Sequence, residues 1–324
     1  MTLPLCTRLA PSPTGPLHLG NARTFLLNWA LGRKRSWRII LRHEDLDYER
    51  VGDDPYRPIE DALGWLGIDW DGPATRQRDD LEPYRSAMKQ LDAHDRIFAC
   101  DLSRSEIRRA ASAPHTDEPS NAYPSHLRPK SREAWSFAEH ATNYRIKVDP
   151  GLENICDELQ GTRVIDPSED SGDFVVWTRS GMPSYQLAVV VDDAANNVTD
   201  VLRGDDLLDS SARQMLLYRH LGSPVPRWWH VPLVYGPDGK RLAKRNGGGE
   251  ILRYRDAGIS PDRVIGLIAY WCGMTTELQP LSSADFMNRI NEDILKDMVR
   301  RECDSAGRTV FTEKEDQWLT EGSP

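Results

Sequence analysis

Residues 10–24 read "APSPTGPLHLGNART" and place three prolines and two glycines directly before a helical pattern. The preceding stretch, "LCTRLA" at 5–10, has the apolar character of a short strand. A stiff loop between a first strand and a first helix brings backbone N–H groups and a helix N-terminus to the carboxyl edge of a sheet. Because such an edge attracts phosphate, the stretch indicates an anion-binding loop with His18 at its end.

The residues that follow alternate between helical and strand patterns. "NARTFLLNWALGRKR" (21–35) has apolar residues at helical spacing, and "WRIILRHED" (37–45) predicts a second strand. "DDPYRPIEDALGWLGI" (53–68) predicts a helix with proline near its start. This order favours an α/β fold with a Rossmann-like, doubly wound parallel sheet.

The chain divides into four predicted regions. Residues 1–96 and 171–246 form the two halves of a Rossmann catalytic domain, 97–170 form an inserted subdomain, and 247–324 form a C-terminal helical extension. The stretch "SAPHTDEPSNAYPSHLRPKSREAW" (112–135) is rich in proline, serine and charge. We therefore expect the insertion to contain a long loop and not to continue the sheet.

The second half of the chain contains further recognisable elements. "YQLAVVV" (185–191) and "VTDVLRG" (198–204) predict strands, the first of them buried, and "SSARQMLLYRHLG" (210–222) predicts a helix opened by a serine cap. "HVPLVYGPDGKRLAKRNGGGE" (230–250) predicts a strand and a glycine-rich basic loop. Helices are expected over about 250–305, and the tail at 313–324 is expected to be mobile.

Composition narrows the class of protein. The 324 residues carry a net charge of -9, which argues against a general nucleic-acid coat protein but allows a local basic surface. No apolar run reaches the roughly 18 residues of a membrane span, and the N-terminus lacks a signal-peptide pattern. The five cysteines are widely spaced, as is typical of reduced thiols, so we expect a cytoplasmic protein.

Two loops carry the candidate chemistry. His18 precedes the first helix, where it could donate to a phosphate oxygen, although "HLG" alone favours a tight turn with a surface histidine. The loop "GKRLAKRNGGG" (239–249) contains cations that could stabilise charge on phosphorus, or could form a solvated basic turn. Their occurrence together favours a nucleotide site.

Four ordered blocks resemble one enzyme family. "RLAPSPTGPLHLGNART" (8–24), "LRHEDLD" (41–47), "VLRGDDLL" (201–208) and "RLAKR" (241–245) are similar to signatures of the glutamyl class I aminoacyl-tRNA synthetases. "HLGN" takes the place of the family's HIGH motif and "RLAKR" that of KMSKR. The resemblance extends from about residue 5 to about residue 255. It implies activation of L-glutamate with ATP, followed by transfer of glutamate to tRNA.

The resemblance also implies roles for individual residues. The glutamate pocket would contain Arg8, Ser12, Glu44, Tyr185 and Arg203. Catalytic contacts to ATP would come from His18, Asn21 and Lys244, with further ATP-binding positions at Pro11, Gly20, Leu242 and Arg245. Mg²⁺ is expected with ATP. Without the resemblance, an internal ion pair with an aspartate would explain either pocket arginine as well.

The chain departs from full-length members of the family. The serine of KMSKR is Ala243, and an asparagine expected four residues after the pocket tyrosine is Val189. Only about 75 residues follow the basic loop, which is short for an anticodon-binding domain. These features resemble the short branch of the family, the glutamyl-Q tRNA(Asp) synthetases, which transfer glutamate to the queuosine base in the anticodon of tRNA(Asp).

The insertion and the C-terminal helices are the expected surfaces for that tRNA. Shape and stacking would guide recognition of an anticodon loop. The candidate cations, each of which could instead belong to a solvated charged face, are Arg104, Arg108, Arg109, Arg128 and Lys130. We expect the protein to act as a monomer.

The insertion resembles an acceptor-binding subdomain whose zinc site is degenerate. The branch often binds zinc through a C-x-C pair, a tyrosine and a third cysteine. Here Cys100 and Tyr123 remain, while Leu102 and Leu127 stand where the other cysteines would be, and leucine cannot ligate zinc. His115 and His126 could form a rearranged site with Cys100, but no spacing supports one. Zinc is therefore not expected.

Other functions share parts of this pattern. A truncated synthetase that charges the 3′ end of tRNA(Glu) would share every active-site residue. A small-molecule adenylyltransferase would not need Arg8, Glu44, Tyr185 and Arg203 together. A non-catalytic glutamate- or tRNA-binding module would not need both phosphate-handling loops.

We expect Lys244→Ala to reduce formation of glutamyl-adenylate strongly and to leave glutamate binding largely intact, since the cation would act on charge that develops at the α-phosphate. Glutamate-dependent ATP–pyrophosphate exchange measures the first effect and equilibrium binding the second. An unchanged exchange rate would contradict the role given to this loop.

Overall fold

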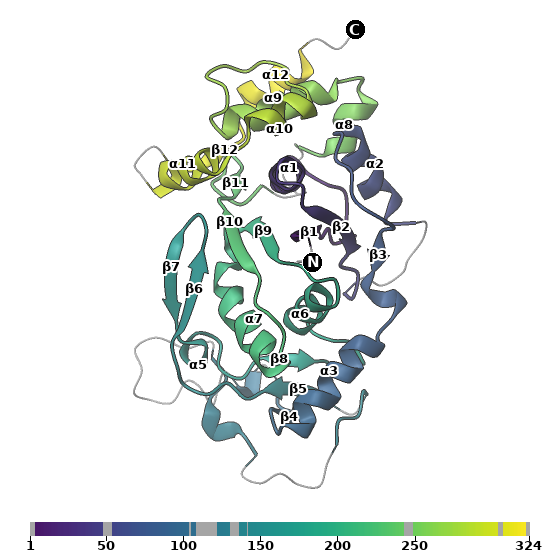
Figure 1. The fold of residues 1–324 in the computed structure, drawn as a ribbon, viewed down its shortest axis with the longest axis vertical. Coiled ribbons are helices and arrows are strands. Elements are labelled where there is room, and N and C mark those ends of the chain that lie inside the picture. Colours follow the sequence, from purple (N-terminus) through teal and green to yellow (C-terminus); the bar gives the residue numbers. More distant parts are fainter. Residues whose placement is uncertain are drawn as a thin grey trace.

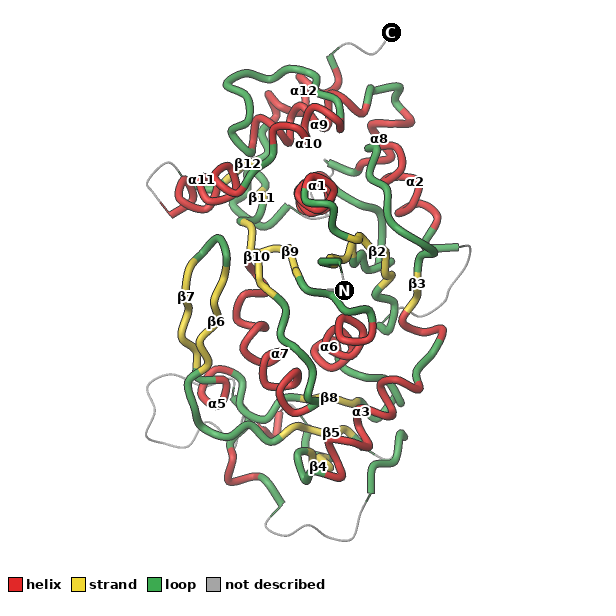
Figure 2. The backbone as a smooth tube through the Cα atoms, in the orientation of Figure 1, coloured by secondary structure: helices red, strands yellow, loops and turns green. Residues whose placement is uncertain are grey.

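A parallel sheet forms the centre of the protein (Figures 1 and 2). The computed structural model describes residues 4–47, 54–103, 105–107, 122–129, 136–140, 142–242, 249–303 and 307–321. Strand β2 (Arg38–His43) pairs in parallel with β1 (Cys6–Leu9) and with β3 (Thr75–Arg76). Strand β10 (Arg227–Val231) pairs in parallel with β9 (Asp200–Gly204) and with β6 (Glu153–Asp157).

The two groups of strands meet at β1 and β9, which lie side by side. The backbone N–H of Thr199 donates to the carbonyl oxygen of Cys6 at 2.9 Å. From β1 the chain winds outward to β2 and β3, and from β9 it winds the opposite way to β10. The strand order therefore reverses between β1 and β9, as in a doubly wound fold.

Side chains of successive strand residues enter two different cores. Ile39 and Leu41 of β2 join one core and Ile40 joins the other, because neighbouring residues point to opposite faces of a strand. Helices α1 (Leu19–Lys34), α2 (Arg57–Trp65) and α9 (Pro261–Trp271) cover the first face. Helices α3 (Glu82–Ala93), α6 (Tyr185–Ala195) and α7 (Leu208–His220) cover the second. The predicted α/β fold with a parallel sheet is thus confirmed.

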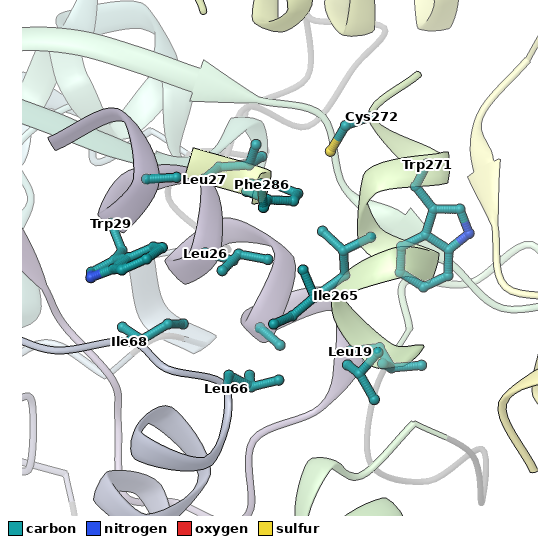
Figure 3. Close-up of a cluster of buried hydrophobic side chains, with 14 of the residues drawn as sticks. Leu19, Leu26, Leu27, Trp29, Leu66, Ile68, Ile265, Trp271, Cys272 and Phe286 are labelled. Carbon is teal, nitrogen blue, oxygen red and sulfur yellow. The ribbon is translucent and has the colours of Figure 1, made fainter. Parts of the chain in front are cut away.

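The C-terminal helices pack on the outer side of α1. Figure 3 shows Leu26 and Leu27 of α1 beside Ile265 of α9 and Phe286 of α10 (Ser283–Arg289). The elements of this region are β11 (Val234–Tyr235), α8 (Ile251–Asp256), α10 (Ser283–Arg289), α11 (Glu292–Cys303), β12 (Thr309–Val310) and α12 (Glu313–Thr320). The helices expected over about 250–305 are present. No helix among the described residues is long and apolar enough to cross a membrane.

The inserted segment divides between two sheets. Strands β4 (Ile97–Cys100), β5 (Asn143–Ile146) and β8 (Val175–Trp177) form a separate antiparallel sheet. Strand β6 and strand β7 (Gly161–Ile165) form a hairpin beside β10 and extend the central sheet (Figure 1). The expectation that the insertion does not continue the sheet is therefore wrong for this hairpin. A short helix, α5 (Pro167–Asp170), follows it.

Two local predictions are wrong for identifiable reasons. Residues 185–191, predicted as a buried strand, form the first two turns of α6. A short run that is apolar on all sides fits a buried strand or a buried helix equally well. Helix α7 begins at Leu208, before the predicted serine cap, so Ser210 and Ser211 lie inside it. The strand predicted at the start of 230–250 is divided between the end of β10 and the separate strand β11 (Val234–Tyr235), and the other predicted strands and helices are confirmed.

The tail is more ordered than its sequence indicates. Thr312 caps α12 and forms a capping box with Glu315, so two backbone N–H groups at the helix start are satisfied. Leu319 is fully buried, and the Tyr254 hydroxyl donates to Asp316 at 2.8 Å. The expectation of a mobile tail is therefore wrong up to residue 321.

Gly266→Ala is expected to lower the free energy of unfolding by about 1–3 kcal/mol, because overpacking strains a closely packed interface. A Cβ at Gly266 in α9 would lie 1.9 Å from the carbonyl oxygen of Gln279. Gly64→Ala in α2 is the matched control, since its Cβ would meet nothing within 4 Å. The control is expected to raise stability by about 0.5–1 kcal/mol. Urea unfolding followed by circular dichroism measures both, and equal effects would contradict the packing argument.

Candidate active site

The carboxyl ends of β1 and β9 open into a cavity of about 530 Å³. This is the crevice where strand order reverses, the usual ligand position in a doubly wound sheet. The predicted site residues that line it are Arg8, Pro11, Ser12, His18, Gly20, Asn21, Glu44, Tyr185, Arg203 and Leu242. Lys244 and Arg245 lie outside the described residues. The fold thus collects residues that are up to 234 positions apart in sequence, from Arg8 to Leu242, and their individual roles remain predictions.

His18 is the N-cap residue of α1. Its Nδ1 accepts hydrogen bonds from the backbone N–H groups of Gly20 at 3.1 Å and Asn21 at 3.3 Å. Because Nδ1 is an acceptor, a neutral ring carries its proton on Nε2. A Cβ at Gly20 would lie 3.1 Å from the imidazole, so glycine permits this close approach. The loop therefore places the His18 ring and the positive end of the α1 dipole beside the cavity.

Backbone hydrogen bonds join the His18 loop (10–18) to the end of the basic loop (239–249). The N–H of Leu19 donates to the oxygen of Gly249 at 2.7 Å, and that of Ile251 donates to the oxygen of Leu17 at 2.9 Å. On the other side of the basic loop, Leu242 is buried and its N–H donates to Val234 at 2.8 Å. Both flanks of the basic loop are consequently fixed at the cavity.

A buried charge network lies beneath the cavity. Arg8 contacts Asp193 through Nε at 3.3 Å, and Arg42 contacts the other oxygen of Asp193 at 2.6 Å. Arg42 also contacts Glu44 at 3.1 Å and Asp192 at 3.6 Å. Burial raises the pKa of Glu44, although Arg42 and Arg8 oppose this effect. Sequence reasoning missed Arg42, which lies in the singled-out stretch 41–47, and Asp193, which lies two residues beyond the stretch 185–191.

The two terminal nitrogen atoms of the Arg8 guanidinium, Nη1 and Nη2, have no hydrogen-bond partner in the part of the chain that the structure describes. The ion pair with an aspartate is therefore present for Arg8, and its role in a glutamate pocket stays a prediction. Its Nε is engaged by Asp193, and its side chain still lines the cavity.

Arg203 is held differently, by neutral acceptors. Its guanidinium donates to His230 Nε2 at 2.9 Å, Gln214 Oε1 at 2.8 Å, Ser211 Oγ at 2.8 Å and the Leu207 carbonyl oxygen at 3.1 Å. It forms no ion pair with a carboxylate of any described residue, so an internal pair with an aspartate does not explain it. Burial lowers the pKa of Arg203, as desolvation disfavours a buried cation. A carboxylate entering the cavity would relieve that cost.

Tyr185 is the first residue of α6 and borders the same cavity. Burial raises the pKa of its hydroxyl, and the nearby charge of Glu44 raises it further. The hydroxyl thus stays protonated over the ordinary pH range and can donate a hydrogen bond to an oxygen in the cavity.

The four positions of the expected zinc motif form a small apolar cluster. Cys100 and Tyr123 are buried, and Leu102 and Leu127 pack against them. The thiol lies 3.8 Å from the Tyr123 hydroxyl, which donates to the Leu127 carbonyl oxygen at 3.2 Å. One thiol and one phenol do not provide the donor set that zinc takes in structural sites. His126 is exposed, and His115 lies outside the described residues.

One expected tRNA-binding cation is already engaged. Arg128 is about one-fifth exposed and forms two hydrogen bonds of 2.6 Å with Asp173. This pairing raises the pKa of Arg128. Arg128 thus contributes to an ion pair within the subdomain, and its contact with tRNA stays a prediction. Arg104, Arg108, Arg109 and Lys130 lie outside the described residues.

Comparison with known proteins agrees with this geometry. The model of a family described as tRNA synthetases class I (E and Q), catalytic domain, matches residues 4–303. The chain belongs to this family. It is thus an enzyme of the aminoacyl-tRNA ligase type, and ATP is its substrate.

Relatives of this class I synthetase fall into two groups by length. A protein from Symbiobacterium thermophilum named glutamyl-Q tRNA(Asp) synthetase is 44% identical over 290 residues, which cover 86% of this chain and 89% of the relative. A glutamate–tRNA ligase 2 from Roseobacter denitrificans is 42% identical over 248 residues, which cover 76% of this chain and 53% of the ligase. The chain therefore spans about half the length of that ligase.

Solved structures show the same fold. The glutamate–tRNA synthetase from Elizabethkingia anophelis superposes with a TM-score of 0.77, covering 98% of this chain and 70% of that protein at 24% identity. At this level of identity, the likeness supports the class I catalytic architecture alone.

Asp193→Asn is expected to lower the free energy of unfolding by about 3–5 kcal/mol, because two buried guanidinium groups lose their shared carboxylate. The matched control is Asp297→Asn, which removes the exposed ion pair with Arg300 and is expected to cost less than about 1 kcal/mol. Denaturant unfolding compares the two variants. Equal losses would show that Asp193 does not hold this network.

Proposed function

We propose that this synthetase activates L-glutamate with ATP to glutamyl-adenylate and transfers the glutamyl group to the queuosine base in the anticodon of tRNA(Asp). The observation that carries the proposal is Arg203, a buried guanidinium at the cavity whose acceptors among the described residues are all neutral. Relatives named for this activity match the chain over most of both lengths, which supports the choice of acceptor.

Glutamate has two carboxylates, and only one of them reacts. The reacting α-carboxylate must face the loop of His18, where phosphate binds. The side-chain carboxylate is then left for the guanidinium groups of Arg203 and Arg8, with which it can form charge-assisted hydrogen bonds. Glu44 binds the substrate ammonium, and Ser12 and Tyr185 donate hydrogen bonds at the cavity wall.

Adenylate formation needs no nucleophile from the protein. An oxygen of the α-carboxylate forms a bond to the α-phosphorus of ATP, and the bond to pyrophosphate breaks. The positive end of the α1 dipole, the His18 ring and the Asn21 side chain hold the phosphates, and Lys244 stabilises the charge that develops at the α-phosphate. Pro11, Gly20, Leu242 and Arg245 complete the ATP site. Mg²⁺ is proposed to accompany ATP and to neutralise the pyrophosphate.

Transfer completes the reaction. A hydroxyl oxygen of queuosine attacks the carbonyl carbon of the adenylate, an ester bond forms as the bond to the AMP phosphate breaks, and AMP and the hydroxyl proton leave. The protein contributes position and charge to both steps, which is where most rate enhancement in such reactions arises. We also propose that the enzyme works as a monomer in the cytoplasm, where both ATP and tRNA are present.

Three purified tRNAs test the proposal: tRNA(Asp) with queuosine, the same tRNA without it, and tRNA(Glu). Each is incubated with enzyme, ATP and radiolabelled glutamate, and ribonuclease digestion then locates the label. We expect label only in the anticodon fragment of queuosine-containing tRNA(Asp). Label at the 3′ end of tRNA(Glu) would instead establish a charging enzyme and overturn the assigned acceptor.

A further inference from the structure

A histidine and an aspartate lie in line behind Arg203. His230 on β10 is fully buried, and its Nε2 lies 2.9 Å from the Nε of Arg203. On the other side of the ring, Nδ1 lies 2.6 Å from Oδ2 of Asp157 at the end of β6. The three side chains come from three neighbouring strands, β9, β10 and β6 (Figure 1).

The hydrogen bonds determine which ring nitrogen of His230 carries the proton. An arginine Nε–H can only donate, so Nε2 of His230 must be an acceptor. The neutral ring therefore carries its proton on Nδ1 and donates it to Asp157. Burial lowers the pKa of His230, so the ring stays neutral. A reversed tautomer would set two N–H groups against each other at Arg203.

Asp157 is fully used by these contacts. One carboxylate oxygen accepts the N–H groups of Leu159 and Gln160 at 2.9 Å each, in the turn between β6 and β7. The other oxygen accepts the backbone N–H of His230 at 3.1 Å as well as its ring N–H. All four partners are donors, so a neutral amide at this position would bring at least one N–H against another.

We propose that Asp157 and His230 are positioning residues of the glutamate site, which act through Arg203. The inference rests on the proposed function and deepens it. Asp157 fixes the tautomer of His230, and His230 holds Arg203 through a neutral acceptor.

The imidazole separates Arg203 from the carboxylate of Asp157. A carboxylate placed directly against Arg203 would form an internal ion pair and satisfy the guanidinium before substrate arrived. The neutral ring orients Arg203 and leaves its charge for a carboxylate in the cavity. This arrangement favours glutamate over glutamine, since an amide carries no charge to pair with the cation.

Three variants test this chain of contacts in the full-length enzyme by glutamate-dependent ATP–pyrophosphate exchange. Asp157→Asn keeps the shape of the side chain but replaces one carboxylate oxygen with an NH₂ group, which faces donors instead of acceptors. His230→Phe removes the acceptor for Arg203, and His230→Gln returns one through its side-chain oxygen. Matched controls are Asp166→Asn, at a helix cap that asparagine also suits, and His94→Gln, at an exposed position.

Asp157→Asn and His230→Phe are expected to raise the KM for glutamate by about tenfold or more, as loss of a bond to a charged group implies. The KM for ATP and the kcat at saturating glutamate should change little, since the interaction concerns ground-state binding of glutamate. His230→Gln should raise the KM for glutamate less than His230→Phe. Both controls should match the wild-type enzyme.

Nitrogen-15 NMR of the histidine rings gives a readout that loss of stability would not mimic. The wild-type enzyme should show His230 protonated at Nδ1, and Asp157→Asn should shift the proton to Nε2. An unchanged KM for glutamate in the folded variants, or an equal rise in the KM values for ATP and glutamate, would overturn the positioning role alone. Absence of glutamate-dependent exchange in the wild-type enzyme would instead overturn the proposed function together with this inference.

Discussion

The structure depends on the reversal of strand order between β1 and β9. Helices leave these two strands in opposite directions, so no helix covers their carboxyl ends, and the cavity opens there. The same adjacency brings Arg8 and Arg203, which are 195 residues apart, to one wall. Helix α1 begins at this edge, so the His18 loop and the arginines line a single cavity.

The buried arginines around the cavity differ in whether a carboxylate of the protein balances their charge. Arg8 and Arg42 share the carboxylate of Asp193, whereas Arg203 meets only neutral acceptors among the described residues. A buried cation without a carboxylate is costly, and it persists in folded proteins when a ligand supplies the missing charge. Arg42 therefore supports the fold, whereas the charge of Arg203 is available to substrate. The residue type alone does not show this difference.

Sequence reasoning succeeded where a signal was local. The loop before α1, helix α1 itself and strand β2 follow from spacing and turn residues within about 30 positions. The run at Tyr185 was misread because it is apolar on every side. Asp157 and His230 were missed because each looks ordinary alone, and only a strand pairing across 73 residues makes them partners. The expectation that zinc is absent rests on ligand chemistry alone, because leucine cannot ligate zinc, and it stays a prediction.

The turn that Asp157 closes has a consequence for how this protein can be recombined. The β6–β7 hairpin belongs by sequence to the inserted segment, yet its aspartate completes a contact that begins on β10. The insertion is therefore not an independent module that can be exchanged between relatives at its ends. A chimaera that joins two parents at the ends of this segment keeps the contact only if position 157 remains aspartate and position 230 remains histidine.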